Sequence, residues 1–378
     1  MVSFLATLPQ VFGGGPSQDT QLGREALSND AHGAGTNIRG MDAGATVLLL
    51  DGQRVAPSGS DAGWEDATVI PLGAIERIDL LPESATAEYG TDALAGVVNL
   101  RLRSNFLGNE TTLRTGMADG PVKERDINQL FGTRWDGGHG VLALEYYSRD
   151  ALAASERSQA TSDQRALGGS NFDVVGGNPG TIVSGANTWA IPNGQDGRSL
   201  SAASLVAGTQ TLTDRWQGAS VLPQEARTSL FGSLTQSVGD VALTADALLA
   251  DRKIVTQTAG YETALSIPTS NPFYVNPTGV PGPVLVLYGF GPDLGPLTTH
   301  ADERIGNVRL GAKWQPAASW QAETTLGYSF ERDTQTIRGF VDPAALAAAL
   351  ADPDLNTAFD PFWRWYPHES GDTPRNRN

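Results

Sequence analysis

Regular alternation of apolar and polar residues is the feature that most limits what this chain can fold into. In residues 320–332, the even positions up to 330 are Trp, Ala, Thr, Leu, Tyr and Phe, and the odd positions are mostly polar. Residues 306–314, 241–249 and 142–146 repeat this pattern. A period of two puts one kind of side chain on each face of a β-strand. The pattern predicts strands with one apolar and one polar face, which a membrane barrel and an ordinary β-sandwich both use.

The lengths of the connections favour the barrel. Residues 136–140, 238–240 and 315–319 form short turns, whereas residues 149–225 and 256–302 are long, polar and rich in Gly and Pro. Short periplasmic turns alternating with long extracellular loops are typical of outer-membrane barrels, and such long loops are uncommon in compact domains. This reading predicts about seven spanning strands, whereas a wide barrel that holds a plug needs roughly 22. The predicted barrel is therefore incomplete.

Composition excludes several classes of protein. The chain has 378 residues, 26 basic and 42 acidic side chains, a net charge of -16 and no cysteine. Such an acidic chain argues against nucleic acid as a partner, because phosphates require clustered Lys and Arg. No apolar run reaches the roughly 18 to 20 residues of a membrane helix, so a membrane-spanning form of this chain must be a closed barrel of strands.

The residues of metal and catalytic chemistry are scattered. His32, His139, His300 and His368 stand apart from one another, without the spacing of a metal site. No nucleophile elbow, phosphate-binding loop or zinc motif occurs. The sequence therefore predicts no metal, no cofactor and no enzymatic activity.

The first hundred residues follow a different pattern, of short strands joined by tight turns. Residues 45–50 are an apolar run that ends at Asp51-Gly52, a favoured type I′ hairpin turn, with a return strand after it. Residues 71–75 begin with a proline and predict one helical turn that leads into a strand over 76–81. Residues 96–103 alternate as a half-buried strand. The prediction is a small α/β domain with a mixed sheet.

Six ordered motifs in this region resemble the plug domain of TonB-dependent outer-membrane receptors. They are LPQ…FGGGPS (Leu8 to Ser17), NIRGM (Asn37 to Met41), VLLLDGQRV (Val47 to Val55), IERIDLLP (Ile75 to Pro82), SATAEYGTDALAGVVNL (Ser84 to Leu100) and RLRSNFLG (Arg101 to Gly108). The resemblance implies a plug domain over residues 1–108, truncated at its amino terminus. Residues 109–378 would then be the N-terminal portion of the transmembrane β-barrel with its long extracellular loops. The expected fold class is a small mixed α/β plug followed by antiparallel transmembrane strands of an incomplete barrel.

The resemblance also assigns roles to charged residues of the plug. In these receptors the arginines of the IRG and ERI motifs pair with carboxylates of the barrel wall and lock the plug in place. Here those motifs supply Arg39 and Arg77, with Glu76 beside the second. Sequence physics alone favours a plainer interpretation, in which these are satisfied surface or sheet-edge charges. We expect Arg39 and Arg77 to lie near each other and to face the wall, without carboxylate partners because the strands that carry those are missing.

Other residues of the motifs are predicted to determine the plug fold rather than to bind a ligand. They are Gly40, Asp51, Gly52, Tyr89, Gly90, Asp92, Gly96 and Asn99.

Aromatic residues in the long loops and the tail have two interpretations, stacking on a ligand or packing of the loop against itself. Packing is the more frequent role of loop aromatics. The residues are Trp189, Trp216, Tyr261, Phe273, Tyr274, Tyr288, Trp363 and Trp365.

The function implied by the resemblance is energy-coupled uptake of a scarce nutrient across the outer membrane of a Gram-negative bacterium. The expected partners are the TonB energy-transducing complex, outer-membrane lipid and a small nutrient ligand. That ligand is a siderophore, cobalamin or an oligosaccharide, and the sequence does not choose between them. A non-transporting binding or signalling receptor and an inactive gene remnant are the alternatives. Neither a signal peptide nor a TonB box is recognisable at the amino terminus, so we expect a truncated chain that does not transport alone.

Overall fold

A computed structural model describes residues 5–18, 29, 31–117, 122–317 and 319–362. The helices, of which those marked η are 3-10 helices, are η1 (Ala43–Ala45), η2 (Leu72–Ala74), α3 (Thr86–Tyr89), η3 (Thr91–Ala93), η4 (Ala154–Glu156), η5 (Arg165–Leu167), η6 (Ala202–Ser204), α4 (Gly291–Leu294) and α5 (Pro343–Ala351). The strands are β1 (Thr46–Leu50), β2 (Gln53–Arg54), β3 (Ile75–Leu81), β4 (Gly96–Leu102), β5 (Gly108–Met117), β6 (Lys123–Trp135), β7 (Gly138–Arg149), β8 (Leu152–Ala153), β9 (Val174–Val175), β10 (Thr181–Ser184), β11 (Asn187–Ala190), β12 (Leu212–Thr213), β13 (Ser220–Leu222), β14 (Gln224–Val238), β15 (Val241–Thr258), β16 (Glu262–Ile267), β17 (Val284–Gly289), β18 (Leu297–Ala317) and β19 (Trp320–Arg338).

The chain divides into two compact units, and each is described by itself. The first unit holds residues 1–152, 222–255 and 300–336. The second, here called the loop unit, holds residues 153–221, 256–299 and 337–378. The predicted division into a plug over 1–108 and a barrel portion over 109–378 follows the sequence motifs and stays a prediction.

Residues up to Leu102, here called the plug, form a four-stranded sheet in the order β2-β1-β4-β3. Strand β1 pairs with β4 in parallel, and the other two pairs are antiparallel. The hairpin between β1 and β2 turns at Asp51 and Gly52, whose φ angles of 49° and 82° fit a type I′ turn. This confirms the predicted mixed sheet, its first hairpin and the helical turn before β3.

The plug sheet is covered on both faces by apolar side chains. Strand β1 is buried along its whole length, because it lies between two other strands. On β4, Val98, Leu100 and Leu102 belong to the main core, whereas Val97 packs in a second cluster with Val47 of β1. The alternating residues of β4 therefore face two different apolar clusters, one on each side of the sheet, and neither side faces solvent.

Gly96 at the start of β4 is a position where the fold requires a glycine. A Cβ added there would lie 2.4 Å from the backbone oxygen of Leu81 and 2.9 Å from Ile38. We expect Gly96→Ala to lower the free energy of unfolding by about 1–3 kcal/mol, because the paired strands β3 and β4 would have to separate. Gly232→Ala is the matched control, since its Cβ would meet only Leu142 at 3.9 Å. Equal denaturation midpoints for the two variants would contradict this interpretation.

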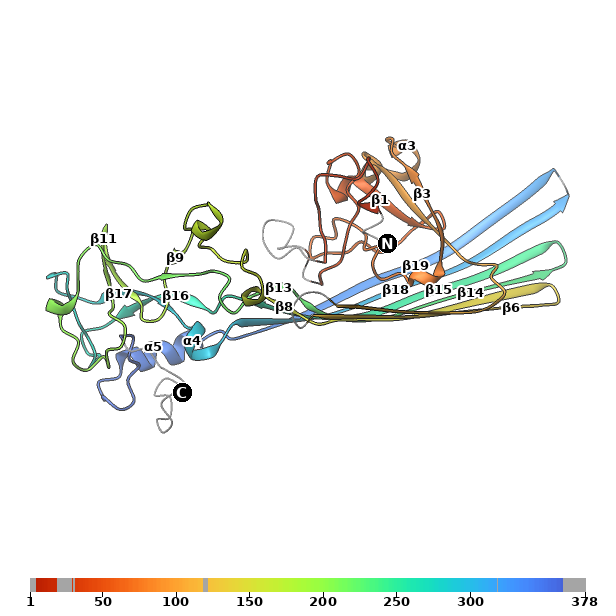
Figure 1. Ribbon diagram of the computed structural model, residues 1–378. Helices are drawn as coiled ribbons and strands as arrows, with labels where there is room; N and C mark the ends of the chain where they lie inside the picture. Colours follow the sequence, from red (N-terminus) through yellow and green to blue (C-terminus); the bar gives the residue numbers. More distant parts are fainter. Residues whose placement is uncertain (1–4, 19–28, 30, 118–121, 318, 363–378) are drawn as a thin grey trace. The chain divides into compact units, whose positions relative to one another are not determined.

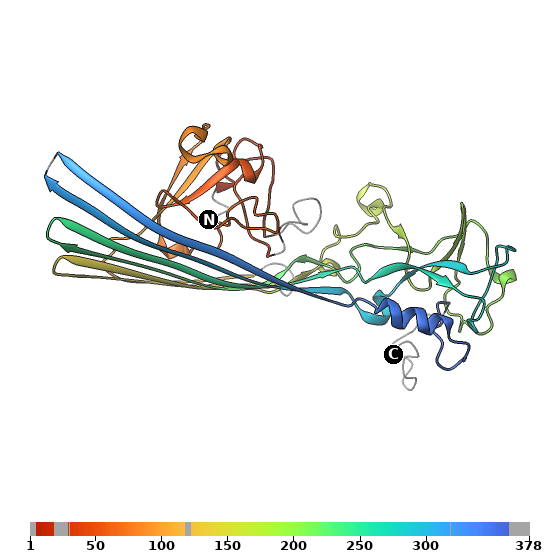
Figure 2. The same ribbon diagram turned by 180° about the vertical axis from the view of Figure 1, so that it is seen from behind.

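The seven-stranded sheet of the first unit, here called the wall, has the order β19-β18-β15-β14-β7-β6-β5. The strands from β5 to β15 pair in antiparallel register through continuous ladders. Figures 1 and 2 show these long strands running side by side with the plug against one face. The predicted strands, their short turns and a count of about seven are confirmed for the described residues, and the sheet does not close into a barrel.

The face of the wall that points away from the plug is apolar and exposed. Its large side chains are Leu113, Ile127, Phe131, Leu142, Leu144, Tyr146, Leu234, Leu243, Leu249, Val308, Leu310, Leu326 and Tyr328, each at least 40% exposed. An outward apolar band is the surface that a barrel presents to lipid. Among the helices of the described residues, none is long and apolar enough to cross a membrane.

The loop unit has a core of its own. A four-stranded sheet in the order β11-β10-β17-β16 carries Ile182, Val286 and Tyr288, all of which are fully buried. The long connections, predicted as extracellular loops, contain short apolar runs that pair with one another as strands. The pattern 284–289 has buried residues at every second position, as a half-buried strand requires.

Most of the loop aromatics pack inside this unit, which fits the interpretation that they pack the loops against themselves. Trp189, Phe273 and Tyr288 are buried in its core, and Tyr261 and Tyr274 pack against it. Trp216 is half-buried elsewhere in the unit, and Trp363 and Trp365 lie outside the described residues.

The aspartate of α4 gives the loop unit a pH-dependent stability. Burial raises the pKa of Asp293 to about 6, and hydrogen bonds from Tyr288 and Asn178 lower it only in part. A carboxyl with a higher pKa in the folded state binds its proton more tightly when folded. The folded unit is therefore most stable below the ordinary aspartate pKa near 4. It loses up to roughly 3 kcal/mol as the pH rises through 6.

Thermal unfolding followed by near-UV circular dichroism between pH 4 and 7.5 measures this effect. Asp293→Asn should unfold at a higher temperature than the parent chain at pH 7.5 and at a similar one at pH 4. Glu156→Gln, at an exposed carboxylate of the same unit, is the control and should follow the parent curve. A parent-like pH dependence in Asp293→Asn would refute the assignment.

Candidate functional site between plug and wall

The plug packs on the inner face of the wall through a shared apolar core. Leu48, Val98 and Leu100 of the plug belong to the same buried cluster as Phe231 of β14 and Leu248 of β15. The inner face of the wall is apolar here, although a barrel lumen is generally polar. The plug therefore takes the place of water over this part of the wall.

A buried arginine of the wall makes the central polar contact of this interface. Arg252 of β15 is fully buried, and its Nη2 donates to Asp66 Oδ2 of the plug and to Glu303 Oε2 of β18. Its Nη1 donates to the hydroxyl of Thr68 at 2.7 Å. Asp66 is fully buried and Glu303 is 2% exposed. One guanidinium thus joins two wall strands to the loop between β2 and η2.

The plug holds Asp66 ready for this contact. Its Oδ1 accepts hydrogen bonds from the backbone N–H groups of Ala34 and Thr68 and from the Thr68 hydroxyl, at 3.0, 2.8 and 2.7 Å. Burial by itself would raise the pKa of Asp66. The Arg252 charge and these hydrogen bonds outweigh burial and keep the pKa below its ordinary value. Asp66 is therefore a carboxylate whose free oxygen points at Arg252.

A second contact lies where the helical turn η2 meets the wall. Pro71 precedes η2 and offers no side-chain cap. The N–H of Leu72, which has no acceptor within the helix, donates instead to Glu145 Oε2 of β7 at 2.7 Å. The next N–H, of Gly73, donates to Asn128 Oδ1 of β6 at 3.3 Å. The wall therefore caps a helix of the plug.

The carboxylate that caps η2 is held by an arginine of the next strand. Arg227 of β14 donates to Glu145 at 2.7 Å and to Glu225 at 3.1 Å, and all three side chains are at most 7% exposed. Gln18 of the plug donates to Glu225 at 3.1 Å. This second cluster lies on β14, which is adjacent to β15, and on β7 beyond it, and it extends the polar interface across the inner face.

A third contact uses the tight turn of the plug. Arg309 of β18 donates to Asp246 of β15 at 2.7 Å, to Asp51 at 3.1 Å and to the carbonyl of Leu50 at 3.1 Å. The other oxygen of Asp51 accepts from the N–H of Leu102 at 3.0 Å. Asp51, which was predicted only as a turn and fold residue, therefore also joins the plug to the wall.

The residues predicted to lock the plug lie elsewhere. Arg39 is exposed, and its Nη2 donates to the carbonyls of Leu94 and Ala95 just before β4. Arg77 is 57% exposed and pairs with Asp79 of its own strand at 3.1 Å. Glu76 is exposed at a bulge of β3. In the described structure the two arginines bond to the plug itself, so their role as a lock stays a prediction.

The expectation that Arg39 and Arg77 lie close together is wrong. Arg39 bonds to Ala95, which precedes the first residue of β4, whereas Arg77 is paired with Arg101 near its end. Six residues of strand separate these points by roughly 20 Å. Arg39 therefore lies beside the beginning of β4, and Arg77 lies beside its end.

The motif residues predicted to determine the fold make contacts within the plug. Arg54 binds Asp92 at 2.9 Å and the carbonyl of Tyr89 at 2.6 Å, and the N–H of Gly52 donates to Asn99 at 2.9 Å. The motif glycines Gly40, Gly52, Gly90 and Gly96 all have positive φ. These contacts fit the predicted structural role.

The sequence motifs match a known family model. Residues 6–97 match the TonB-dependent receptor plug domain, which covers the plug as the structure shows it. The chain therefore contains a plug domain of the kind found in TonB-dependent receptors.

Curated relatives agree with this family. The chain is 33% identical over 113 residues to the vitamin B12 transporter BtuB of Vibrio vulnificus, covering 30% of this chain and 18% of the relative. It is 25% identical over 229 residues to BtuB of Vibrio cholerae, covering 56% and 36%. It is 36% identical over 74 residues to the iron-regulated outer membrane virulence protein of V. cholerae, covering 18% and 11%. The chain thus matches less than two fifths of the length of each of these relatives.

Among solved structures, the siderophore receptor PirA from Pseudomonas aeruginosa aligns with a TM-score of 0.35 and 14% identity, over 80% of this chain and 44% of PirA. The predicted location, the Gram-negative outer membrane, follows from the family and its relatives.

Proposed function

We propose that this TonB-dependent receptor chain forms the plug and part of the wall of a transporter that takes a scarce nutrient across the outer membrane. The energy would come from the TonB complex, and the nutrient would be a siderophore, cobalamin or an oligosaccharide. The match of residues 6–97 to the plug family carries this proposal. The buried plug–wall contacts support it, because a plug that blocks a pore needs specific attachments which can be broken.

The chemistry of those contacts suits a reversible attachment. Removing one partner from a buried ion pair costs about 3–5 kcal/mol, whereas a pair that separates into water recovers hydration of both charges. Hydration of the separated charges therefore offsets part of the free energy that undocking of the plug requires. Arg252 and Asp66 are the residues that we propose to separate when the plug moves.

A chimera tests the transport proposal. The aligned segment of this chain would replace the corresponding segment of V. cholerae BtuB, in a host that lacks its own receptor for vitamin B12. We expect uptake of labelled cobalamin that depends on TonB, measured beside the same host without TonB. Surface labelling confirms that the chimera reaches the outer membrane. Uptake that is equal without TonB, or no uptake by a chimera that is present at the surface, would overturn the proposal.

A further inference from the structure

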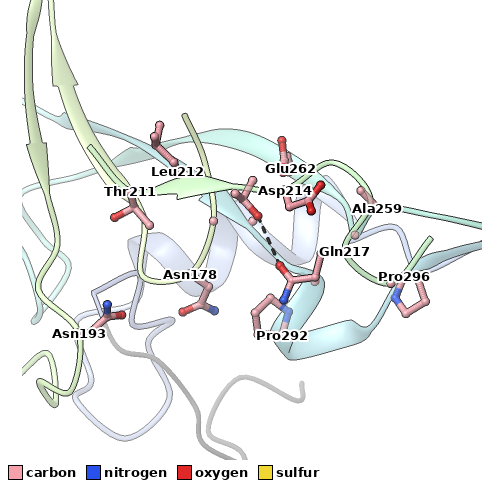
Figure 3. Close-up of a pocket in the computed structure, with 16 residues that line it drawn as sticks. Asn178, Asn193, Thr211, Leu212, Asp214, Gln217, Ala259, Glu262, Pro292 and Pro296 are labelled. Carbon is pink, nitrogen blue, oxygen red and sulfur yellow. Dashed lines mark hydrogen bonds between the residues drawn. The ribbon is translucent and has the colours of Figure 1, made fainter. Parts of the chain in front are cut away.

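A cavity lies inside the loop unit, apart from the plug and its contacts. Its volume is about 460 Å³, within the range of about 300–1,000 Å³ that small-molecule sites occupy. Figure 3 shows side chains from several segments around it, with Thr211 and Gln217 near β12, Glu262 on β16 and Pro292 on α4. The cavity belongs wholly to one compact unit, so its walls are fixed by that unit's own sheet and core.

Glycines bring the walls of this cavity close together. A Cβ at Gly260 would lie 2.3 Å from the Cα of Gly291, and a Cβ at Gly289 would lie 3.0 Å from the Cα of Gly177. These four glycines all line the cavity. Because glycine has no side chain, the backbone peptide groups of these residues are exposed to the cavity, which suits recognition of a polar molecule.

The polar groups around the cavity are neutral or acidic. Asn178, Asn193, Gln217 and Thr211 contribute amides and a hydroxyl, and Asp214 and Glu262 contribute carboxylates. The Asp214 oxygens already accept hydrogen bonds from Thr161, Ser162 and Trp216. The lining includes no Lys, Arg or His. An anionic ligand would therefore meet no cation in the lining itself, since Arg215, whose charge acts on Glu262, lies outside it. An ammonium group would gain a charge-assisted hydrogen bond from a carboxylate.

Two of these polar groups have unused hydrogen-bonding capacity. The Asn178 side chain is 7% exposed, and its Nδ2 donates to Tyr288 and Asp293. Its Oδ1 is buried and has no hydrogen-bond partner among the described residues. Glu262 is exposed at the cavity and makes no hydrogen bond or ion pair within that part of the chain. Both of these groups are acceptors, so the cavity offers two unused acceptors to the donor groups of a ligand.

We infer that this cavity binds a small molecule that bears hydroxyl and ammonium groups and no negative charge, of the size and chemistry of an amino sugar. Its hydroxyls would bond to the amides and to backbone groups, and its ammonium to Glu262. The inference goes beyond the transport function, because it concerns binding to the loop unit alone.

Three probes of one size and different charge test it. Isothermal titration calorimetry of the full chain in detergent micelles would use glucosamine (cationic at pH 6.5), glucose (neutral) and gluconate (anionic). We expect glucosamine to bind at one site, glucose to bind at least tenfold more weakly, and gluconate not to bind. Equal binding of all three, or no binding of glucosamine, would overturn the inference, whereas the transport proposal would be unaffected.

Two substitutions at the cavity sharpen the test. Glu262→Gln keeps the shape of the side chain and should weaken glucosamine binding at least tenfold, while Glu156→Gln at an exposed site outside the cavity should leave it unchanged. Gln217→Lys places an ammonium group at the cavity and should abolish glucosamine binding and permit gluconate binding. Parent-like affinities in Glu262→Gln and Gln217→Lys would show that the probe binds elsewhere.

Discussion

Replacing Arg252 by methionine should lower the free energy of unfolding of the plug–wall unit by about 3–5 kcal/mol, because two buried carboxylates would lose their shared cation. Asp66 and Glu303 remain enclosed in the variant, at no more than 2% exposure. The lower stability should appear first as release of the plug. Of Arg252, Asp66 and Glu303, Asp66 is in the plug and the other two are in the wall. Chemical denaturation in detergent micelles, with limited proteolysis of the plug, measures both effects.

Two controls separate charge from packing. Arg304→Met removes an arginine of the neighbouring strand β18, whose pair with Asp251 is 71% and 45% exposed, and should change stability by no more than about 0.5 kcal/mol. Combining Arg252→Met with Asp66→Asn and Glu303→Gln removes the uncompensated charges and should recover most of the loss. A single Arg252→Met variant as stable as Arg304→Met would contradict the description of the interface.

A chain with this seven-stranded wall alone should show no transport at all. The wall ends at β5 on one side and β19 on the other, and neither edge is paired within the described structure. Unpaired N–H and C=O groups in hydrocarbon cost several kcal/mol each, so an open sheet of this kind does not persist in a membrane. These 378 residues by themselves, when directed to the outer membrane, should be degraded or should aggregate through these edges.

Gel migration and uptake in a receptor-deficient strain test this second prediction. A closed barrel migrates differently before and after heating, so the expected result is a single position that heating does not change. Labelled cobalamin and ferric siderophores should not accumulate. Heat-dependent migration together with uptake would show that the chain closes a pore, for example by assembling with further copies of itself.

The sequence predicts the wall and the plug sheet well because their signals are local. An alternation such as that of residues 320–330 decides which face each side chain occupies, and an Asp51-Gly52 pair decides where a hairpin turns. Both depend on residues that are adjacent in the chain. The register of β6 with β7 and of β14 with β15 then follows from the short turns that join them, whereas β7 and β14 are joined through the long loop segments.

The plug–wall contacts could not be predicted in the same way, because their partners are far apart in the chain. Asp66 and Arg252 are separated by 186 residues, and Leu72 and Glu145 by 73. Arg252 does have a local signal, because it occupies an inner-face position in a series with the buried residues Leu248, Ala250 and Ile254. A charge in such an apolar series predicts a partner, but not its identity.

The family motifs drew attention to different arginines. Arg39 and Arg77 stand in apolar strand-like motifs, yet the structure places both at the surface of the plug. The backbone of Arg39 is in the left-handed region (φ 58°), and Arg77 lies beside a β-bulge. Both features turn the side chain away from the core, and neither is evident from the motif alone. Their pairing with a wall carboxylate stays a prediction.

The central claim, that a buried ion pair holds the plug on the wall, is tested most directly by a double-mutant cycle between Asp66 and Arg252. Asp66→Asn, Arg252→Met and the combined variant would be compared with the parent chain for the free energy of plug release in detergent micelles. We expect a coupling energy of at least about 2 kcal/mol, as found for close, desolvated charge pairs. Additive effects, with a coupling energy near zero, would show that plug and wall are not joined by this pair.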